Sequence, residues 1–462
     1  MHLKSIGRIL PLFFLLFFVS SFAKKIRLLP SRIDYLHYNE QTSGKISERN
    51  AVAKALFNRK DLESFEFIRR QAKTQERAAL SAYIPQATFG LKKARVNPTQ
   101  LLHPETSEPT LCPSETSLSD VTFGATQLIF SAGKPLLDYR VAKEGTRIVE
   151  LDEQTAANNI RFSTESAFLE TQRLHWKKSF IATQDQAAKI SFSQNACANT
   201  VGFLNQADWQ SAIAQYGTIQ SDVFNYPREQ TRRFDTLQRE VSAPISPENL
   251  DFSLQNVENI FLEPLDFYLR AALLHRPDLE KQKRSAVQAK WQEKSYRRSY
   301  MPEVKIYAEA FDNQLKIWGP RHRLSRWAAG LRLDWAFDGL FNVHKAEQSK
   351  NLEVQFKLQE KDLELQIETD VKTTHEQIKI LQNKLKAQAL SLKQQKTNLL
   401  FKRNQFEVGN ISKAELAEAE RSYKETEFNL ISLQIDIKIT YQNLLFICGY
   451  PKNIGDGHRV VT

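Results

Sequence analysis

The chain repeats itself, and the repeat constrains the fold more than any other feature. Two stretches 217 residues apart share an Arg-x-Asp-Leu pattern before a helical run that ends at Tyr-x-Pro. Farther along, the two copies match at a register of 206–207 residues, as at the Val-Gly pairs Val201-Gly202 and Val408-Gly409. A chain that repeats a whole fold-sized unit usually builds a pseudo-symmetric architecture. The matches at the first offset are Leu56/Leu273, Arg59/Arg276, Asp61/Asp278, Tyr83/Tyr300 and Pro85/Pro302.

Residues 1–23 have the pattern of a secretory signal peptide. Lys4 and Arg8 precede an apolar run that ends at Val19, and small residues near Ala23 suit cleavage. The run is short for a membrane-spanning helix, and a retained anchor is the alternative. We expect cleavage, which removes Lys4 and Arg8 and lowers the net charge from +11 to +9.

Composition argues against nucleic-acid binding, metal binding and catalysis. The positive charge is spread along predicted helices and forms no compact patch with aromatic residues, so we expect no nucleic-acid partner. The odd number of cysteines, Cys112, Cys197 and Cys448, leaves at least one thiol unpaired, and no Cys/His metal spacing occurs. The motifs of phosphate-binding loops, zinc proteases and serine hydrolases are missing from the sequence, so we predict neither an enzyme nor a cofactor.

Long stretches without Gly or Pro predict unusually long helices. The stretch 341–408 would measure about 100 Å as one helix. Residues 146–201 form a similar stretch in the first copy, and 410–448 predict a returning helix in the second. In the first copy we expect the returning helix to be interrupted at Gly217 and Pro227.

The last two predicted helices have an apolar repeat of seven residues, which predicts left-handed coiled-coil packing. Some positions of this apolar seam are Gln, Thr or Lys. Such a mixed seam is expected of helices that contact several neighbouring helices and also water. An ordinary antiparallel coiled-coil hairpin in a scaffolding protein is the alternative. The seam positions are Ile367, Val371, Thr374, Ile378, Leu381, Leu385, Gln388, Leu392, Gln395, Leu399, Lys402 and Phe406, then Leu416, Ala419, Tyr423, Thr426, Leu430, Leu433, Ile437, Thr440, Leu444 and Ile447.

Four strands are expected, at about 85–96, 120–130, 301–311 and 326–337. In the last one, apolar residues alternate with small or charged ones, which is typical of an outer-membrane strand that faces lipid on one side. A half-buried sheet of a soluble protein would alternate similarly. Four strands cannot close a barrel, and open edges cannot face lipid, so a membrane location requires several chains to pool their strands. The expected lipid-facing residues are Trp327, Leu331, Leu333, Trp335 and Phe337.

The order and spacing of these motifs resemble the TolC-type outer-membrane factors, the outer membrane efflux protein family. The resemblance rests on Arg276-Pro277-Asp278-Leu279 at a helix start, Tyr300-x-Pro302 at its end, Leu333-x-Trp335-x-Phe337-Asp338-Gly339 after a strand, Phe406-Glu407-Val408-Gly409 at a hairpin turn, and the same order in the first copy. It implies a mainly α fold with a β-barrel part. Three chains would form a trimeric 12-stranded outer-membrane β-barrel and a periplasmic α-barrel of long antiparallel coiled-coil helices.

The resemblance also implies site residues. The hairpin tips Val201-Gly202-Phe203 and Val408-Gly409-Asn410 match the positions that dock a periplasmic adaptor, although Gly also ends ordinary helices. Asp208, Glu415 and Glu418 match an acidic ring at the periplasmic aperture, although they would also suit a solvated helix. The chain departs from the family's usual pattern at Ile411 and Asn404-Gln405, and basic residues crowd the second tip, which puts gate locking and strong cation selectivity in doubt.

These inferences predict an exit duct of a tripartite efflux or type I secretion system in the bacterial outer membrane. Its partners would be two further copies of the chain, a periplasmic adaptor, an inner-membrane transporter and outer-membrane lipid. A soluble periplasmic coiled-coil scaffold or adaptor is the alternative. The expected divisions are a signal peptide (1–23), a first repeat (24–245, with its tip near 202), a second repeat (246–449, with its tip near 409) and a C-terminal tail (450–462).

Overall fold

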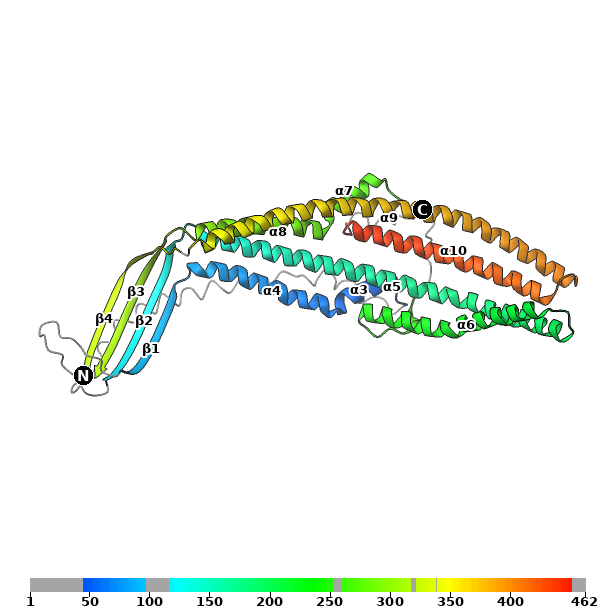
Figure 1. Ribbon diagram of the computed structural model, residues 1–462, viewed down its shortest axis with the longest axis horizontal. Coiled ribbons are helices and arrows are strands. Elements are labelled where there is room, and N and C mark those ends of the chain that lie inside the picture. The colour runs from blue at the N-terminus through cyan, green and yellow to red at the C-terminus, as the bar shows by residue number, and fades with distance from the viewer. Residues whose placement is uncertain (1–44, 97–115, 253–259, 317–320, 338, 451–462) are drawn as a thin grey trace.

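The computed structural model describes residues 45–96, 116–252, 260–316, 321–337 and 339–450. The predicted signal peptide, Cys112 and all but the first residue of the predicted tail lie outside these residues. A four-stranded sheet forms one end of an elongated molecule, and long helices extend from it to the other end (Figure 1). The main elements are α3 (Glu48–Asn58), α4 (Lys60–Leu80), β1 (Gln86–Val96), β2 (Thr116–Phe130), α5 (Lys134–Thr200), α6 (Gln206–Val241), α7 (Leu265–His275), α8 (Pro277–Arg298), β3 (Glu303–Lys316), β4 (Arg321–Asp334), α9 (Phe341–Glu407) and α10 (Lys413–Ile447).

The duplication predicted from the sequence is visible in the elements. The long helices α5 and α9 each have 67 residues, about 100 Å of helix. Each begins after a residue in the left-handed conformation, Gly133 and Leu340, which lie 207 positions apart. The Arg-x-Asp-Leu patterns mark helix starts in both copies, because Arg59 and Arg276 have extended backbones that separate α3 from α4 and α7 from α8.

The sheet is an antiparallel meander in the order β1-β2-β3-β4. Its strands differ in length from those expected, since β2 begins at Thr116 and β3 extends to Lys316. Trp335 and Phe337, which we expected inside the last strand, follow its end at Asp334. The partner strand β3 begins at Glu303, which pairs with Asp334. Residues after Asp334 therefore have no residue of β3 to pair with. The Trp335 indole N–H instead donates to the Tyr300 carbonyl at 3.0 Å.

The predicted interruption of α6 is wrong. This helix runs unbroken through Gly217 and Pro227. Packing on α5 compensates for the missing backbone donor at Pro227. The neighbouring Tyr226 is buried, and its hydroxyl donates to the Leu174 carbonyl at 2.9 Å. Lys177 of α5 also pairs with Glu229 of α6 at 3.2 Å.

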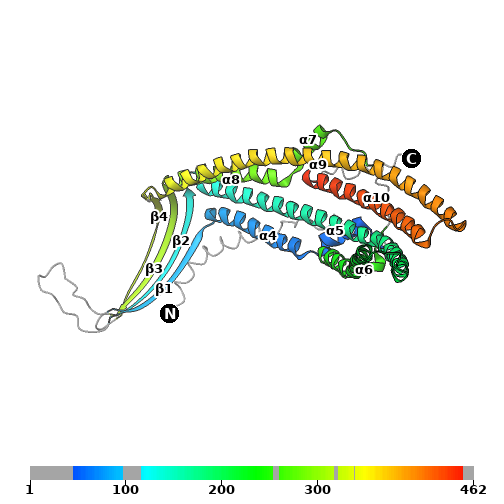
Figure 2. The same cartoon turned by 45° about the vertical axis from the view of Figure 1, so that its right-hand side comes forward.

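The short helices pack in the spaces beside the long ones. The central helix α5 contacts α4, α6, α8 and α10, and α9 contacts α8 and α10. Figure 2 shows α4 and α6 following each other along one side of α5, as α8 and α10 do along its other side. Half of the predicted seam positions on α9 are buried, namely Ile367, Val371, Thr374, Ile378, Leu385 and Leu399, whereas Phe406 at the end of the seam is exposed.

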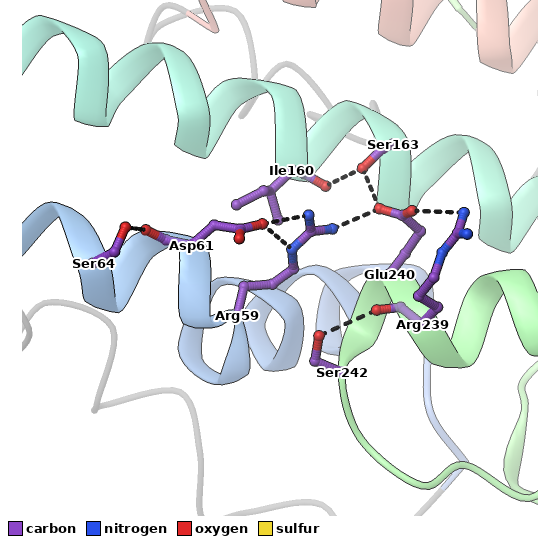
Figure 3. Close-up of polar contacts among 8 residues, drawn as sticks. All are labelled: Arg59, Asp61, Ser64, Ile160, Ser163, Arg239, Glu240 and Ser242. Carbon is purple, nitrogen blue, oxygen red and sulfur yellow. Dashed lines mark hydrogen bonds and ion pairs between the residues drawn. The ribbon is translucent and has the colours of Figure 1, made fainter.

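A polar joint ties the first copy together where α4 meets α6 (Figure 3). The Arg59 guanidinium donates to the Glu240 carboxylate at 2.8 Å and to Asp61 at 2.7 Å. The Ser163 hydroxyl of α5 donates to the same Glu240 oxygen at 2.7 Å. Both Arg59 and Glu240 are largely shielded from water, so their mutual loss of hydration is offset by charge-assisted hydrogen bonds.

In the second copy Arg276 still pairs with Asp278 at 2.9 Å, but the positions that match the Glu240 side of the joint are apolar. At the register of 207, Glu240 and Val241 correspond to Ile447 and Cys448, both buried. Burial raises the pKa of the Cys448 thiol to about 12, so it packs as a neutral group. The following Gly449 has φ +75°, and a Cβ there would lie 2.5 Å from the His275 carbonyl oxygen, so only glycine fits.

We expect Glu240→Ala to loosen the first joint. It removes the acceptor shared by Arg59 and Ser163, and hydrogen bonds to charged groups contribute about 1.5–3 kcal/mol. Amide hydrogen exchange in the last two turns of α6 should therefore accelerate about tenfold or more. The control Lys60→Ala removes only the exposed Lys60–Glu63 pair and should leave exchange unchanged. Equal protection in both variants would contradict the role of the joint.

Candidate functional site

The two hairpin tips have the same backbone geometry. Gly202 and Gly409 both have φ +79° after the last helical turn. The N–H of Phe203 donates to the Ala198 carbonyl at 2.9 Å, and that of Asn410 donates to the Gln405 carbonyl at 2.8 Å. These bonds satisfy carbonyls at the ends of α5 and α9 in the Schellman pattern, in which glycine readily takes the left-handed conformation. Helix capping thus accounts for the glycines in full.

Capping does not account for the apolar side chains beside those glycines. Val201, Phe203 and Val408 are 69%, 86% and 75% exposed. Asn410 is exposed as well. Both tips lie at the end of the molecule opposite the sheet, side by side in Figures 1 and 2. The fold therefore presents apolar turn residues from both copies at one end.

The predicted acidic residues follow the tips, and two of them take part in helix capping. The N–H of Asp208 donates to the Asn205 side chain at 2.7 Å, and that of Glu415 donates to the Ser412 hydroxyl at 3.2 Å. An acidic residue at this third helical position is favoured by the cap and by the helix dipole. Helix capping alone therefore explains why acidic residues occupy both positions, and a role at a periplasmic aperture is not needed to explain them.

Local basic partners reduce the negative charge of the second tip. Glu415 pairs with Lys402 across the α9–α10 hairpin at 3.6 Å, and Glu418 pairs with Arg421 at 2.6 Å. The sequence shows basic residues around this tip but does not predict that Lys402 pairs with Glu415. Facing charged positions in antiparallel coiled-coil helices are the signal that could have found this pair.

The sheet has one apolar and one polar face. Directly opposed residues share a face, so the register groups Trp327 with Ala310, and Leu331 with Ile306. The apolar face continues onto β2 and β1 at Phe123 and Phe89. Its large side chains, which are 41–80% exposed, are Phe89, Leu91, Phe123, Ile306, Trp327, Leu331 and Leu333.

The opposite face carries mainly small and polar residues, together with the aromatic Tyr307 and Phe311. Thr88 and Thr122 lie beside Gly124 and Gly90 there, and each threonine hydroxyl approaches the carbonyl of the opposing glycine. Near the helical end, Lys305 pairs with Glu303 at 2.8 Å and with Asp334 at 3.2 Å. Ion pairs on one face and exposed apolar side chains on the other indicate two different surroundings for the sheet.

Two further features bear on function: membrane-spanning helices and metal-binding clusters. Within the described ranges, no helix combines the length and the apolar character needed to cross a membrane. In the same part of the chain, no cluster of three or more His, Cys, Asp or Glu side chains is arranged to hold a metal ion.

We expect Gly409→Ala to destabilise the second tip and Gly217→Ala to stabilise α6. A Cβ atom at either position would meet no other atom within 4 Å, so the backbone conformation alone determines how alanine changes the stability. Alanine in the left-handed conformation costs about 1–2 kcal/mol, whereas alanine in place of a helical glycine stabilises by about 0.5–1 kcal/mol. Thermal unfolding followed by circular dichroism should show a lower midpoint for the first variant and a higher one for the second. Shifts of the same sign would contradict this account of the turn.

Comparison with known proteins agrees with the geometry. The sequence model of the family described as outer membrane efflux protein matches residues 268–450. No curated protein matches the sequence. The CmeC outer membrane channel of Campylobacter jejuni superposes with a TM-score of 0.68 at 15% identity, covering 89% of this chain and 90% of that chain.

Two further channels have the same fold. The outer membrane protein VceC of Vibrio cholerae has a TM-score of 0.67 at 14% identity, covering 87% of this chain and 96% of that chain. The open state of the Neisseria gonorrhoeae MtrE outer membrane channel has a TM-score of 0.67 at 14% identity, covering 88% of this chain and 89% of that chain. The resemblance of the chain to the outer membrane efflux protein family, which its motifs indicate, is thereby confirmed, and its fold is that of the outer-membrane channels.

Proposed function

We propose that the protein is the outer-membrane duct of a tripartite efflux or type I secretion system, through which substrates pass passively. The observation that carries the proposal is the exposed apolar face of a sheet whose two edge strands have no second partner strand within the described ranges. A soluble scaffold would leave this face in water, where so large an apolar patch is rarely tolerated.

The height of the apolar face suits a membrane. It extends along β3 from Val304, opposite Leu333, to the row of Leu91 and Val121. These eight residue steps measure about 27 Å, and a strand tilt near 40° reduces that to about 20 Å of height. The apolar bands of outer-membrane barrels are about 25 Å tall.

The open edges of β1 and β4 favour a homotrimer. Among the described residues, each edge strand pairs with one neighbour, and an unpaired edge is costly in lipid. Three copies would join four strands each into a closed barrel of twelve. The duplicated helices would then continue the wall of the tunnel, and the polar sheet face would line it.

The tips are proposed as the adaptor-docking site. The tips, with the exposed Val201, Phe203 and Val408, lie at the end opposite the sheet (Figure 1), on the side where a partner from the inner membrane would approach. The acidic residues Asp208, at the start of α6, and Glu415 and Glu418, in the first two turns of α10, are proposed to line the periplasmic aperture. A signal peptide at residues 1–23 would direct the chain to export.

We expect Trp327 to contact lipid, because its side chain is 80% exposed on the apolar face. In vesicles that contain brominated lipids, part of the tryptophan fluorescence should be quenched, and Trp327→Phe should remove much of that part. Trp291→Phe is the matched control, since this ring lies in the helical region under Arg140 at 4.6 Å. Quenching that is insensitive to Trp327→Phe, together with recovery of the protein as a soluble monomer, would favour the periplasmic scaffold.

We expect Glu415→Ala combined with Glu418→Ala to weaken cation selectivity in planar bilayers. The change removes two carboxylates per chain and releases Lys402 and Arg421 from their ion pairs, so the local potential becomes more positive. Lys402→Gln should shift selectivity in the opposite direction. If reversal potentials in a salt gradient are the same for all three proteins, these residues do not line the conduction path.

A further inference from the structure

Toward the tips, the layer of long helices has α6 along one edge and α9 along the other. In this part of the molecule α6 packs on α5, α5 on α10, and α10 on α9. Figures 1 and 2 show α6 and α9 on opposite sides of the layer. Each of these two helices therefore packs one face on its own chain and turns another face outward.

The outward face of α9 carries a second repeat of seven residues. Its positions alternate three and four residues apart, as those of the buried seam do, but every one of them is exposed. Ile380, Leu390 and Phe401 are 54%, 71% and 58% exposed. Large apolar side chains at this spacing on an exposed face indicate packing against a further helix. We call these positions the α9 edge seam: Ile380, Asn383, Ala387, Leu390, Gln394, Thr397 and Phe401.

The outward face of α6 has the same spacing with small side chains. Small residues let a neighbouring helix approach closely, and large side chains of that helix then fill the space between the two backbones. The large residues of the α9 edge seam therefore complement the face of α6 in size. We call the positions on α6 the α6 edge seam, and all of them are exposed: Ala207, Ser211, Ala214, Thr218, Ser221 and Asn225.

The two edge helices also have opposite charge in their tip halves. Residues 377–406 of α9 include seven Lys or Arg and no Asp or Glu. Residues 206–227 of α6 include Asp208 and Asp222 and no Lys or Arg. Opposite charge on two helices favours their association over the association of either helix with its own kind.

One exposed charge lies beside each edge seam. Lys384 follows the α9 seam position Asn383, and Asp222 follows the α6 seam position Ser221. Within the described ranges, neither charge pairs with an oppositely charged side chain. Because α9 runs toward the tips and α6 runs away from them, two such helices pack antiparallel, and residues one step after the seam then lie on the same side of the contact.

Lys384 and Asp222 also lie at a similar distance from the tips. Asp222 comes 20 residues after Gly202, and Lys384 comes 25 residues before Gly409. At ~1.5 Å per residue these separations are about 30 Å and 38 Å of helix, a difference that the two side chains together can span.

We propose that the α9 edge seam of one copy packs antiparallel on the α6 edge seam of a second copy, with Lys384 of the first copy beside Asp222 of the second. The inference rests on the proposed function, in which β4 of one copy pairs with β1 of the next. The helices continue that order, because β4 leads into α9, while α4, which precedes β1, lies in line with α6. Pairing of the strands alone would leave the edge helices of the tip half without a contact, so the helical interface is a separate claim.

The test links the two edge seams chemically in the purified full-length protein in mild detergent. Cys112 and Cys197 are first replaced by serine, which leaves the buried Cys448 as the native thiol. Ala387→Cys with Ser221→Cys then places one thiol on each seam, and a short bismaleimide joins thiols that lie close together.

The matched control is Ala389→Cys with Ser221→Cys. Ala389 is also an exposed alanine of α9, but it lies two residues along, about 200° around the helix from Ala387. We expect covalent dimers and trimers of the chain on denaturing gels from the first pair, and monomers from the control pair and from each single-cysteine variant. A link within one chain is excluded, because α6 and α9 lie on opposite edges of the layer.

A particle of three chains in which the first pair links no better than the control would overturn this inference and leave the proposed duct intact. A monomeric particle would overturn both.

Exchange of charges tests the ion pair. Lys384→Asp places like charges together and should lower the temperature at which the particle dissociates, and adding Asp222→Lys should restore that temperature. Lys386→Asp removes an equally exposed lysine on the other side of the seam, so Asp222→Lys should not compensate for it. Equal compensation of both lysine variants, or compensation of neither, would contradict the placement of Lys384 beside Asp222.

Discussion

The structure depends on one constraint, the pairing of backbone donors and acceptors at the edges of the sheet. In the part of the chain that the structure describes, β1 and β4 each leave one edge of the sheet without a partner strand, while one face exposes apolar side chains such as Phe89 and Trp327. Water can hydrogen-bond to the unpaired backbone groups at the edges, but contact between water and the apolar face is unfavourable. Lipid solvates the apolar face but cannot hydrogen-bond to the edges. Joining several copies edge to edge, as we propose, would satisfy both the free edges and the apolar face.

The helices follow from the same duplication, with different chemistry in each copy. Leu237 and Leu444 are fully buried at matching positions where the returning helices end. Beside them the first copy uses Glu240, held by Arg59 and Ser163, and the second uses the apolar Ile447 and Cys448. Removing one partner of a shielded ion pair is costly, whereas apolar packing tolerates volume-conserving change. Equivalent positions therefore have unequal sensitivity to substitution.

Sequence periodicity predicted most of the helices, because stretches without Gly or Pro and a seven-residue apolar repeat are local signals. The interruption of α6 was mispredicted since Tyr226 and Glu229 anchor the flanks of Pro227 to α5, a contact that only the tertiary structure reveals. Strand ends were misjudged for a similar reason, as pairing with a neighbour decides where a ladder stops. At the tips, the residues were found by pattern, but the Lys402–Glu415 pair depends on how two helices face each other. The functional assignment of the tip and aperture residues stays a prediction.

The number of chains in the particle tests the central claim most directly. The full-length protein would be extracted from outer membranes in mild detergent, and its mass would be measured by native mass spectrometry. We expect a particle of three chains, because we propose that three four-stranded sheets join edge to edge in one closed barrel of twelve strands. A monomeric particle with the sheet still folded would contradict the claim that edge pairing between copies completes the structure.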